Sequence, residues 1–175
     1  AYLLRHGHRP VLWSPPAARL ERRGGVARIA CTGALDGEVE IELLPAPERL
    51  AGFDTVIVCL PGNAYADVLG RLAPLWRDGQ TVIVSGALSL APLWLREQAA
   101  RRGCDLHAAG WATTPTTAHF LPDGRLHANP LRHRIDMAST GAGDRILALC
   151  AALLGDRFVD AGDLLAPTLA NINPI

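Results

Sequence analysis

Two short apolar runs constrain the fold of this chain most strongly. Residues 55–60 (TVIVCL) and 81–85 (TVIVS) are rich in β-branched side chains and carry no charge, as is typical of strands that are covered on both faces of a sheet. Between these runs, residues 63–76 repeat apolar side chains at helical spacing. A strand, a helix and a second strand at this spacing predict a βαβ unit with a parallel sheet.

The same alternation extends along the rest of the chain. A hairpin over residues 28–44, turning at Asp36-Gly37, interrupts the alternation, and we expect it at a sheet edge. The sequence therefore predicts an α/β fold: one partial domain over residues 1–175 with a Rossmann-type, mostly parallel sheet, helices on both faces and a small β-hairpin insertion. Further strands are expected at residues 8–14 and 105–111 and within 126–139, and helices at residues 1–7, 15–23, 47–52, 90–102, 143–154 and 163–171.

Charge and residue usage exclude several classes of function. The 17 basic residues balance 17 acidic ones, so no charge excess favours a nucleic-acid or a membrane partner. All the basic residues are arginine, which excludes Schiff-base and lysine general-base chemistry within this chain. No apolar run approaches the roughly 20 residues that span a bilayer, and no secretory signal begins the chain. We expect a cytoplasmic protein whose four widely spaced cysteines are reduced and buried.

The glycine pattern lacks the fingerprint of a complete dinucleotide-binding sheet. Such a sheet begins with a strand, a G-x-G-x-x-G turn and a helix whose N-terminus receives the pyrophosphate. Residues 1–7 (AYLLRHG) are typical of the end of a helix that Gly7 closes. We therefore expect the first strand and its glycine-rich turn to precede residue 1, and the chain to be a piece of a longer protein. Gly24-Gly25 and Gly141-Ala-Gly143 are poor substitutes, a loop and a helix start.

Two segments carry a resemblance to a known family. Residues 32–84 combine a Thr-Gly…Gly-Glu hairpin, an Ala-Gly-x-Asp entry to a strand, a proline after that strand, and Asp-Gly-Gln-Thr-Val. Near the end, residues 171–174 read Asn-Ile-Asn-Pro. Together these segments resemble the nucleotide domain of the octopine/nopaline (opine) dehydrogenases, over roughly residues 7–175. The ketopantoate reductases and glycerol-3-phosphate dehydrogenases share this architecture but fit the segments less well.

The resemblance implies an NAD(P)H-dependent reductive condensation of an amino acid with a 2-oxo acid, which are the expected small-molecule partners. It also implies a histidine just after Ile175 as the acid/base, oriented by an aspartate of a second, helical domain. No catalytic residue is then expected within the chain itself. A homodimer is a candidate assembly.

Cofactor-binding residues are expected in the loops after the strands, because open parallel sheets bind ligands beyond the carboxyl ends of their strands. Ser14 holds the position where an acidic residue would bind the adenine ribose, and the arginines at 19, 22 and 23 favour NADP slightly over NAD; a solvated helix face is the rival interpretation of those arginines. Leu60, Pro61 and Gly62 are expected beside the phosphates or ribose, with a plain strand-ending turn as the rival. Ser85 is expected on the nicotinamide side.

Substrate-binding residues are expected at Thr113, Asn171 and Asn173, although helix capping competes for the two asparagines. The loop over residues 110–116 keeps a threonine and a proline but lacks the Glu and Tyr that this loop often carries in the family. A non-catalytic dinucleotide-binding domain therefore stays open as an alternative, as does a ketopantoate-reductase-like enzyme that reduces a 2-oxo acid without an amine. The histidines show no H-x-x-x-H or H-E-x-x-H spacing, so no metal site is expected.

Overall fold

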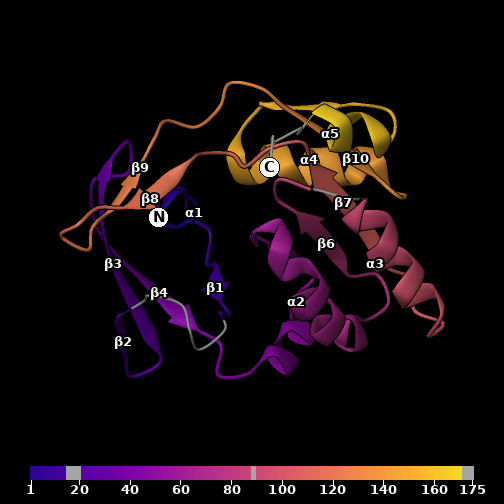
Figure 1. The fold of residues 1–175 in the computed structure, drawn as a ribbon, viewed down its shortest axis with the longest axis horizontal. Coiled ribbons are helices and arrows are strands. Elements are labelled where there is room, and N and C mark those ends of the chain that lie inside the picture. Colours follow the sequence, from indigo (N-terminus) through magenta and orange to yellow (C-terminus); the bar gives the residue numbers. More distant parts are fainter. Residues whose placement is uncertain (15–20, 88–89, 171–175) are drawn as a thin grey trace. The chain divides into compact units, whose positions relative to one another are not determined.

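The chain folds into two compact units (Figure 1). The computed structural model describes residues 1–14, 21–87 and 90–170. Unit 1 comprises Ala1–Arg49 and Thr116–Arg132, and unit 2 comprises Leu50–Pro115 and His133–Ile175. Each unit holds its own sheet, and the predicted α/β class with mostly parallel pairing and covering helices is confirmed.

Unit 2 is built on the two apolar runs that dominate the sequence. They form neighbouring parallel strands, and a third strand continues the parallel set on the other side of the second run. The next strand runs antiparallel to the third and pairs with a parallel edge strand. In spatial order the sheet is β11 (Phe158–Asp160), β10 (Ile135–Ser139), β7 (His107–Trp111), β6 (Thr81–Val84) and β5 (Thr55–Val58).

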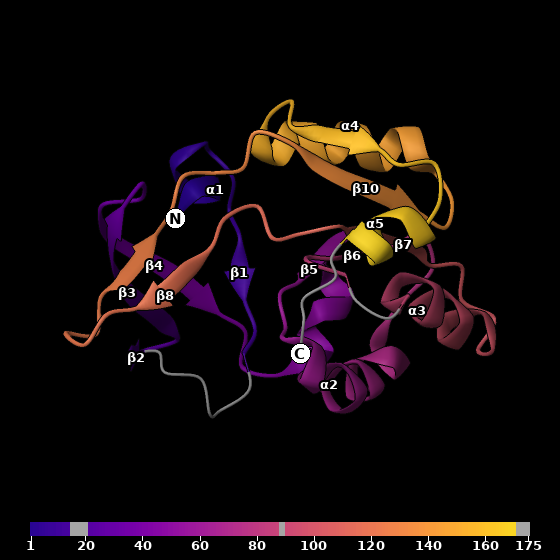
Figure 2. The same ribbon diagram turned by 45° about the horizontal axis from the view of Figure 1, so that its top comes forward.

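Helices cover this sheet, and all four residues of its strand β6 are buried. In Figure 2, α3 lies beside β7 and α4 lies along β10, in line with the contacts of these elements. Leu69, Leu95 and Ile146 bring one fully buried side chain each from α2, α3 and α4 into the core. The helices are α2 (Tyr65–Leu72), flanked by the 3-10 turns η2 (Gly62–Ala64) and η3 (Ala73–Leu75), α3 (Ala91–Ala100), α4 (Gly143–Leu154) and α5 (Leu165–Ala170).

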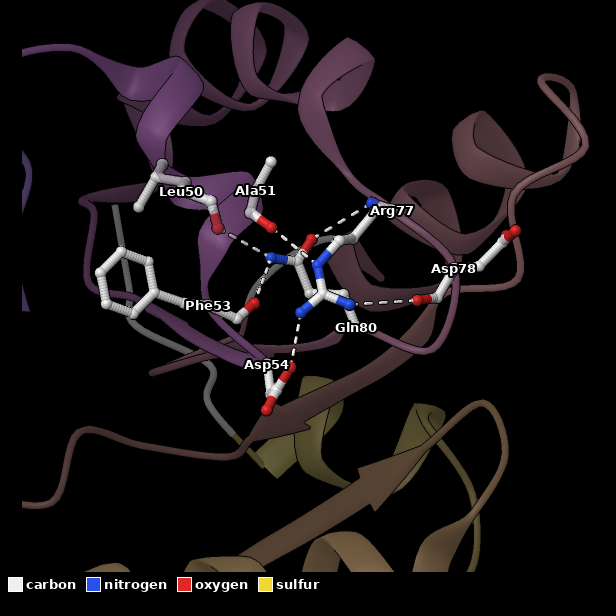
Figure 3. Close-up of polar contacts among 7 residues, drawn as sticks. All are labelled: Leu50, Ala51, Phe53, Asp54, Arg77, Asp78 and Gln80. Carbon is white, nitrogen blue, oxygen red and sulfur yellow. Dashed lines mark hydrogen bonds and ion pairs between the residues drawn. The ribbon is translucent and has the colours of Figure 1, made fainter.

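A buried glutamine clamps the amino-terminal edge of this sheet (Figure 3). The Gln80 side chain is fully buried, and its Nε2 donates to the carbonyl oxygens of Leu50, at 3.0 Å, and Phe53, at 2.8 Å. Its Oε1 accepts from the backbone N–H of Arg77 at 3.3 Å. Together with the bond from Arg77 Nε to the Ala51 carbonyl at 2.7 Å, these bonds attach the last residues of η1 (Pro47–Gly52) to the start of β6.

Unit 1 contains the second sheet. Its central hairpin pairs Val26 with Glu42 and Cys31 with Gly37. A short parallel strand flanks the hairpin on each side, and helix α1 (Tyr2–Arg5) precedes them in the chain. In spatial order the sheet is β1 (Val11–Leu12), β4 (Gly37–Leu43), β3 (Val26–Gly33), β9 (Leu126–Ala128) and β8 (Ala118–Phe120), with β2 (Glu21–Arg23) also pairing with β3.

The predictions for residues 15–23 and 28–44 need correction. Residues 15–20 of the predicted helix lie outside the described residues, and its last three residues form β2. Gly24 and Gly25 join β2 to β3 with φ of 57° and 82°. Two central residues with positive φ make the type I′ connection that suits a hairpin. The prediction that the hairpin over residues 28–44 lies at a sheet edge is wrong, because this hairpin forms the middle of a separate sheet in unit 1.

The other elements agree closely with the predictions. The predicted helices and strands of unit 2 are present with ends shifted by at most four residues, and β11 is the described strand of this unit that was not expected. Strand β8 of unit 1 was not expected either. Within the described residues, no helix combines the length and the apolar character needed to cross a membrane.

Candidate functional site

Three loops of unit 2 lie at one edge of its sheet, because β5, β6 and β7 are parallel and in register. We define the carboxyl edge as residues 59–62, 85–87 and 112–115, which follow these strands. Backbone bonds hold the middle loop between its neighbours: Ser85 N–H donates to the Val58 carbonyl at 2.9 Å, and Ala87 N–H donates to the Trp111 carbonyl at 2.8 Å. The edge is therefore a fixed frame rather than three independent loops.

Ser85 presents an unusual polar group at this edge. Ser85 is 3% exposed. Its Oγ is buried and makes no hydrogen bond of normal geometry, although the neighbouring Cys59 thiol interacts with it weakly. A buried hydroxyl without a partner costs free energy, so native structures rarely keep one without a reason. A ligand bound at the carboxyl edge would supply the missing partner.

The loop after β6 is tied to the elements around it at Gly86. The Tyr65 hydroxyl donates to the Gly86 carbonyl at 3.1 Å and links the loop to α2. Gly86 has a φ of 67°, which glycine adopts without strain. A Cβ at this position would lie 3.4 Å from Cγ2 of Thr114, so the loops after β6 and β7 come close together here.

Gly110 of β7 permits a second close contact, between β7 and the loop after β6. A Cβ on Gly110 would lie 2.7 Å from the Cβ of Ala87 and 2.9 Å from Cγ of Pro92. Both distances are shorter than real carbon contacts. The missing side chain thus lets the loop after β6 and the first turn of α3 pack directly onto β7.

The loop after β5 ends in an exposed turn. Leu60 is half-buried, whereas Pro61 and Gly62 are exposed. The Pro61 carbonyl accepts from the Ala64 N–H at 2.9 Å, which closes the 3-10 turn η2. An exposed turn with a glycine lets a ligand approach the main chain closely.

Cys59 corrects the expectation of four buried thiols. Cys31 and Cys150 are buried and Cys104 is half-buried, but Cys59 is exposed at the carboxyl edge. Although the residue is exposed, desolvation of its thiol raises the thiol pKa, and an interaction with the Ser85 hydroxyl lowers it by less. The Cys59 thiol is therefore the neutral form at pH 7, and all four cysteines are free.

Strand β10 brings polar side chains to the carboxyl edge that sequence reasoning missed. Because β10 is antiparallel to β7, its first residues lie beside the last residues of β7, and the Asp136 carbonyl accepts from Ala112 N–H at 2.8 Å. Arg134 Nε donates to Asp136 Oδ1 at 2.9 Å, with 69% of the arginine side chain exposed. Local sequence does not determine whether a strand runs parallel or antiparallel to its neighbour. No sequence motif therefore predicts that Arg134 and Asp136 lie at the carboxyl edge.

The structure brings together five of the eight predicted site residues. Leu60, Pro61, Gly62, Ser85 and Thr113 all lie at the carboxyl edge of unit 2, with Thr113 half-buried. Ser14 belongs to unit 1. Asn171, Asn173 and Arg19 lie outside the described residues, and Arg22 and Arg23 belong to strand β2 instead of a helix.

No protein-family model and no curated protein matches the chain. Solved structures do match its fold. Octopine dehydrogenase with NADH and L-arginine is 15% identical with a TM-score of 0.62, covering 85% of this chain and 40% of its own. Yersinopine dehydrogenase with NADP⁺ is 16% identical with a TM-score of 0.60, covering 83% of this chain and 38% of its own.

A ketopantoate-type reductase matches equally well. The 2-dehydropantoate 2-reductase of Geobacter metallireducens is 16% identical with a TM-score of 0.61, covering 95% of this chain and 55% of its own. The chain therefore spans about 40% of the octopine dehydrogenase length and about half of this reductase. The resemblance expected from the sequence is confirmed in the fold that the chain shares with these dehydrogenases.

Proposed function

We propose that the chain forms most of the NAD(P)-binding domain of an oxidoreductase of the opine dehydrogenase type. The reaction would be the reductive condensation of an amino acid with a 2-oxo acid. The observation that carries the proposal is the buried, unpartnered Ser85 hydroxyl at the carboxyl edge. A Rossmann-type sheet takes its dinucleotide at this edge, and the neighbours in fold include structures with NADH and NADP⁺.

Each loop has a separate part in this proposal. The turn at residues 60–62 would lie along the ribose and phosphates, and the Ser85 hydroxyl would bond a polar atom on the nicotinamide side. Thr113 would face the substrate. The nicotinamide, when bound, supplies the hydride for the imine carbon, while these residues bind and orient it. The acid/base histidine expected after Ile175 would supply the proton, because an imidazole titrates near neutral pH.

For the cofactor, we propose that the site binds NADP slightly more tightly than NAD. Ser14 is neutral, so this position would not repel a 2′-phosphate as a carboxylate would. Competition between NADH and NADPH for one site measures the preference directly.

A ketopantoate-reductase-like function is the second candidate, favoured by the 95% of this chain that the Geobacter reductase covers. The two reactions differ in one requirement, because an opine-type enzyme needs an amine together with the 2-oxo acid. NADPH oxidation with a 2-oxo acid alone would favour the second candidate. Tight NADPH binding without turnover of any such pair would favour a non-catalytic dinucleotide-binding domain.

The 175-residue chain by itself should bind NADPH with a dissociation constant weaker than about 1 mM. It contains no G-x-G-x-x-G sequence, and the backbone N–H groups of such a turn hold the pyrophosphate. A longer protein in which a strand and this turn precede residue 1 should bind NADPH at micromolar concentration. Nicotinamide fluorescence measures both constants, and micromolar binding by the 175-residue chain would contradict the first expectation.

Replacing Ser85 by alanine should separate binding from stability. In the longer protein, Ser85→Ala should weaken NADPH binding by roughly three- to tenfold, the value of one hydrogen bond. The free energy of unfolding should stay constant or rise by up to about 1 kcal/mol, because the substitution removes an unpaired buried hydroxyl.

Thr140→Val is the matched control for this test. The Thr140 hydroxyl lies beside the first residues of β7, away from the carboxyl edge, and is paired with Ala108: it accepts from the Ala108 N–H at 3.3 Å and donates to the Ala108 carbonyl at 3.2 Å. This variant should lose about 1 kcal/mol of stability and keep its NADPH affinity. A Ser85→Ala protein with unchanged affinity would remove the observation on which the proposed function rests.

A further inference from the structure

Two histidines of unit 1 stand opposite each other on the hairpin β8–β9. The register pairs His119 of β8 with His127 of β9 across the antiparallel strands. Residues in this relation point to the same face and bring their side chains together. Their ring centroids are 5.4 Å apart, with the ring planes tilted by 50°.

The neighbouring strand leaves space for the second of these rings. Gly33 of β3 has a φ of 84°, and a Cβ on it would lie 2.8 Å from Cε1 and 3.1 Å from Nδ1 of His127, and against the Ala128 carbonyl oxygen. The imidazole of His127 therefore lies over bare backbone, where a side chain of β3 would displace it. This contact limits the positions the ring can take, and it is independent of the pairing with His119.

The separation of the rings fits two ligands of one metal ion. A metal–nitrogen bond of about 2.1 Å and a tetrahedral angle place the centres of two coordinating imidazoles about 5 Å apart. A small rotation of the exposed His119 side chain would close the remaining difference. Imidazole nitrogens suit zinc, nickel and copper ions, whereas magnesium and calcium prefer oxygen.

We propose that His119 and His127 bind one divalent transition-metal ion, zinc or nickel, with water in the remaining positions. No group of three His, Cys, Asp or Glu side chains is placed to hold a metal within the described part of the chain, so this pair would act alone. The nearby Asp123 already accepts from the backbone N–H of Arg125 at 3.0 Å and from its Nε at 2.8 Å. The ion would clamp β8 to β9, which are only three residues each.

The strength of binding can be measured on the whole chain with nickel as the probe. Isothermal titration calorimetry should show one Ni²⁺ per chain with a dissociation constant on the order of 10 µM. His119→Gln and His127→Gln should each weaken this constant by at least about tenfold, because each removes one of two ligands. His133→Gln, in an exposed loop of unit 2, is the matched control and should leave the constant unchanged.

The location of the ion can be measured with diamagnetic zinc. Long-range ¹H–¹⁵N spectra resolve the ring nitrogens of the six histidines, and zinc should shift those of His119 and His127 alone. Circular dichroism of the metal-free His119→Gln chain should match that of the parent chain, because His119 is exposed, so this variant tests the loss of a ligand in an unchanged fold. Equal nickel affinity in all variants, or zinc-induced shifts at other histidines with His119 and His127 unmoved, would overturn the proposal.

Discussion

Replacing Gln80 by methionine is expected to lower the free energy of unfolding by about 3 kcal/mol. Methionine has nearly the length and shape of glutamine, so the substitution leaves little cavity, but it removes all three hydrogen bonds of the side chain. The Phe53 carbonyl and the Arg77 N–H would then lose this partner, and the Leu50 carbonyl would keep only its bond from the Phe53 N–H at 3.2 Å. Each buried polar group left unpaired costs about 1–3 kcal/mol, and the partly buried Phe53 carbonyl would regain some of this from water.

Urea denaturation followed by tryptophan fluorescence measures this loss, because Trp76, Trp94 and Trp111 all belong to unit 2. The midpoint should fall while the slope of the transition stays constant. Gln98→Met on α3 is the matched control, since Gln98 is half-buried on a helix surface, and it should change the stability by less than about 0.5 kcal/mol. A loss below about 1 kcal/mol for Gln80→Met would show that the clamp does not hold η1 to the sheet.

The sheet of unit 2 could be predicted from the sequence, whereas the Gln80 clamp could not, for physical reasons. Residues 55–58 and 81–84 are uncharged and β-branched, and such a run can be satisfied only where both faces are covered. Gln80, in contrast, follows Asp78-Gly79, and this pattern predicts the exposed end of a polar turn. Its burial depends on the carbonyls of Leu50 and Phe53, which lie 30 and 27 residues earlier in the chain, and no local pattern contains that information.

The errors in unit 1 have a different origin. Residues 15–23 carry prolines at the start and arginines at the end, which favour a helix locally, while the adjacent Gly24-Gly25 is a two-residue hairpin signal. The pairing of β2 with β3 overrides the helical preference over Glu21–Arg23. Strands β8 and β11 have only three residues each, too few for a period-two pattern to emerge.

Some residues of the candidate site could be predicted from the sequence and others could not. Residues 60–62, Ser85 and Thr113 could be grouped from the sequence, because parallel strands end at one edge and the loops after them must meet there. The Arg134–Asp136 pair could not, since it depends on the antiparallel direction of β10. The pair His119 and His127 likewise matches no local metal-binding spacing, because strand register brings the two rings together.

Replacing Gly110 by alanine is expected to lower the free energy of unfolding by about 2 to 3 kcal/mol. The added methyl group would overlap Ala87 and Pro92, both buried against β7, and overpacking of this kind costs typically 1–3 kcal/mol. Ala87 is held by its bond to the Trp111 carbonyl, so the strain would pass into the loop that carries Ser85. The same variant in the longer protein should therefore also weaken NADPH binding.

A matched glycine and a second substitution make this prediction specific. Gly70 lies exposed within α2 with nothing within 4 Å of a Cβ, so Gly70→Ala should raise stability by about 0.5 to 1 kcal/mol, the opposite sign. Adding Ala87→Gly to Gly110→Ala removes the closer of the two clashes and should recover part of the loss, which a double-mutant cycle measures as a favourable coupling. If Gly110→Ala is as stable as the parent chain, or if Ala87→Gly adds its cost independently, the close packing of this loop on β7 does not fix the carboxyl edge.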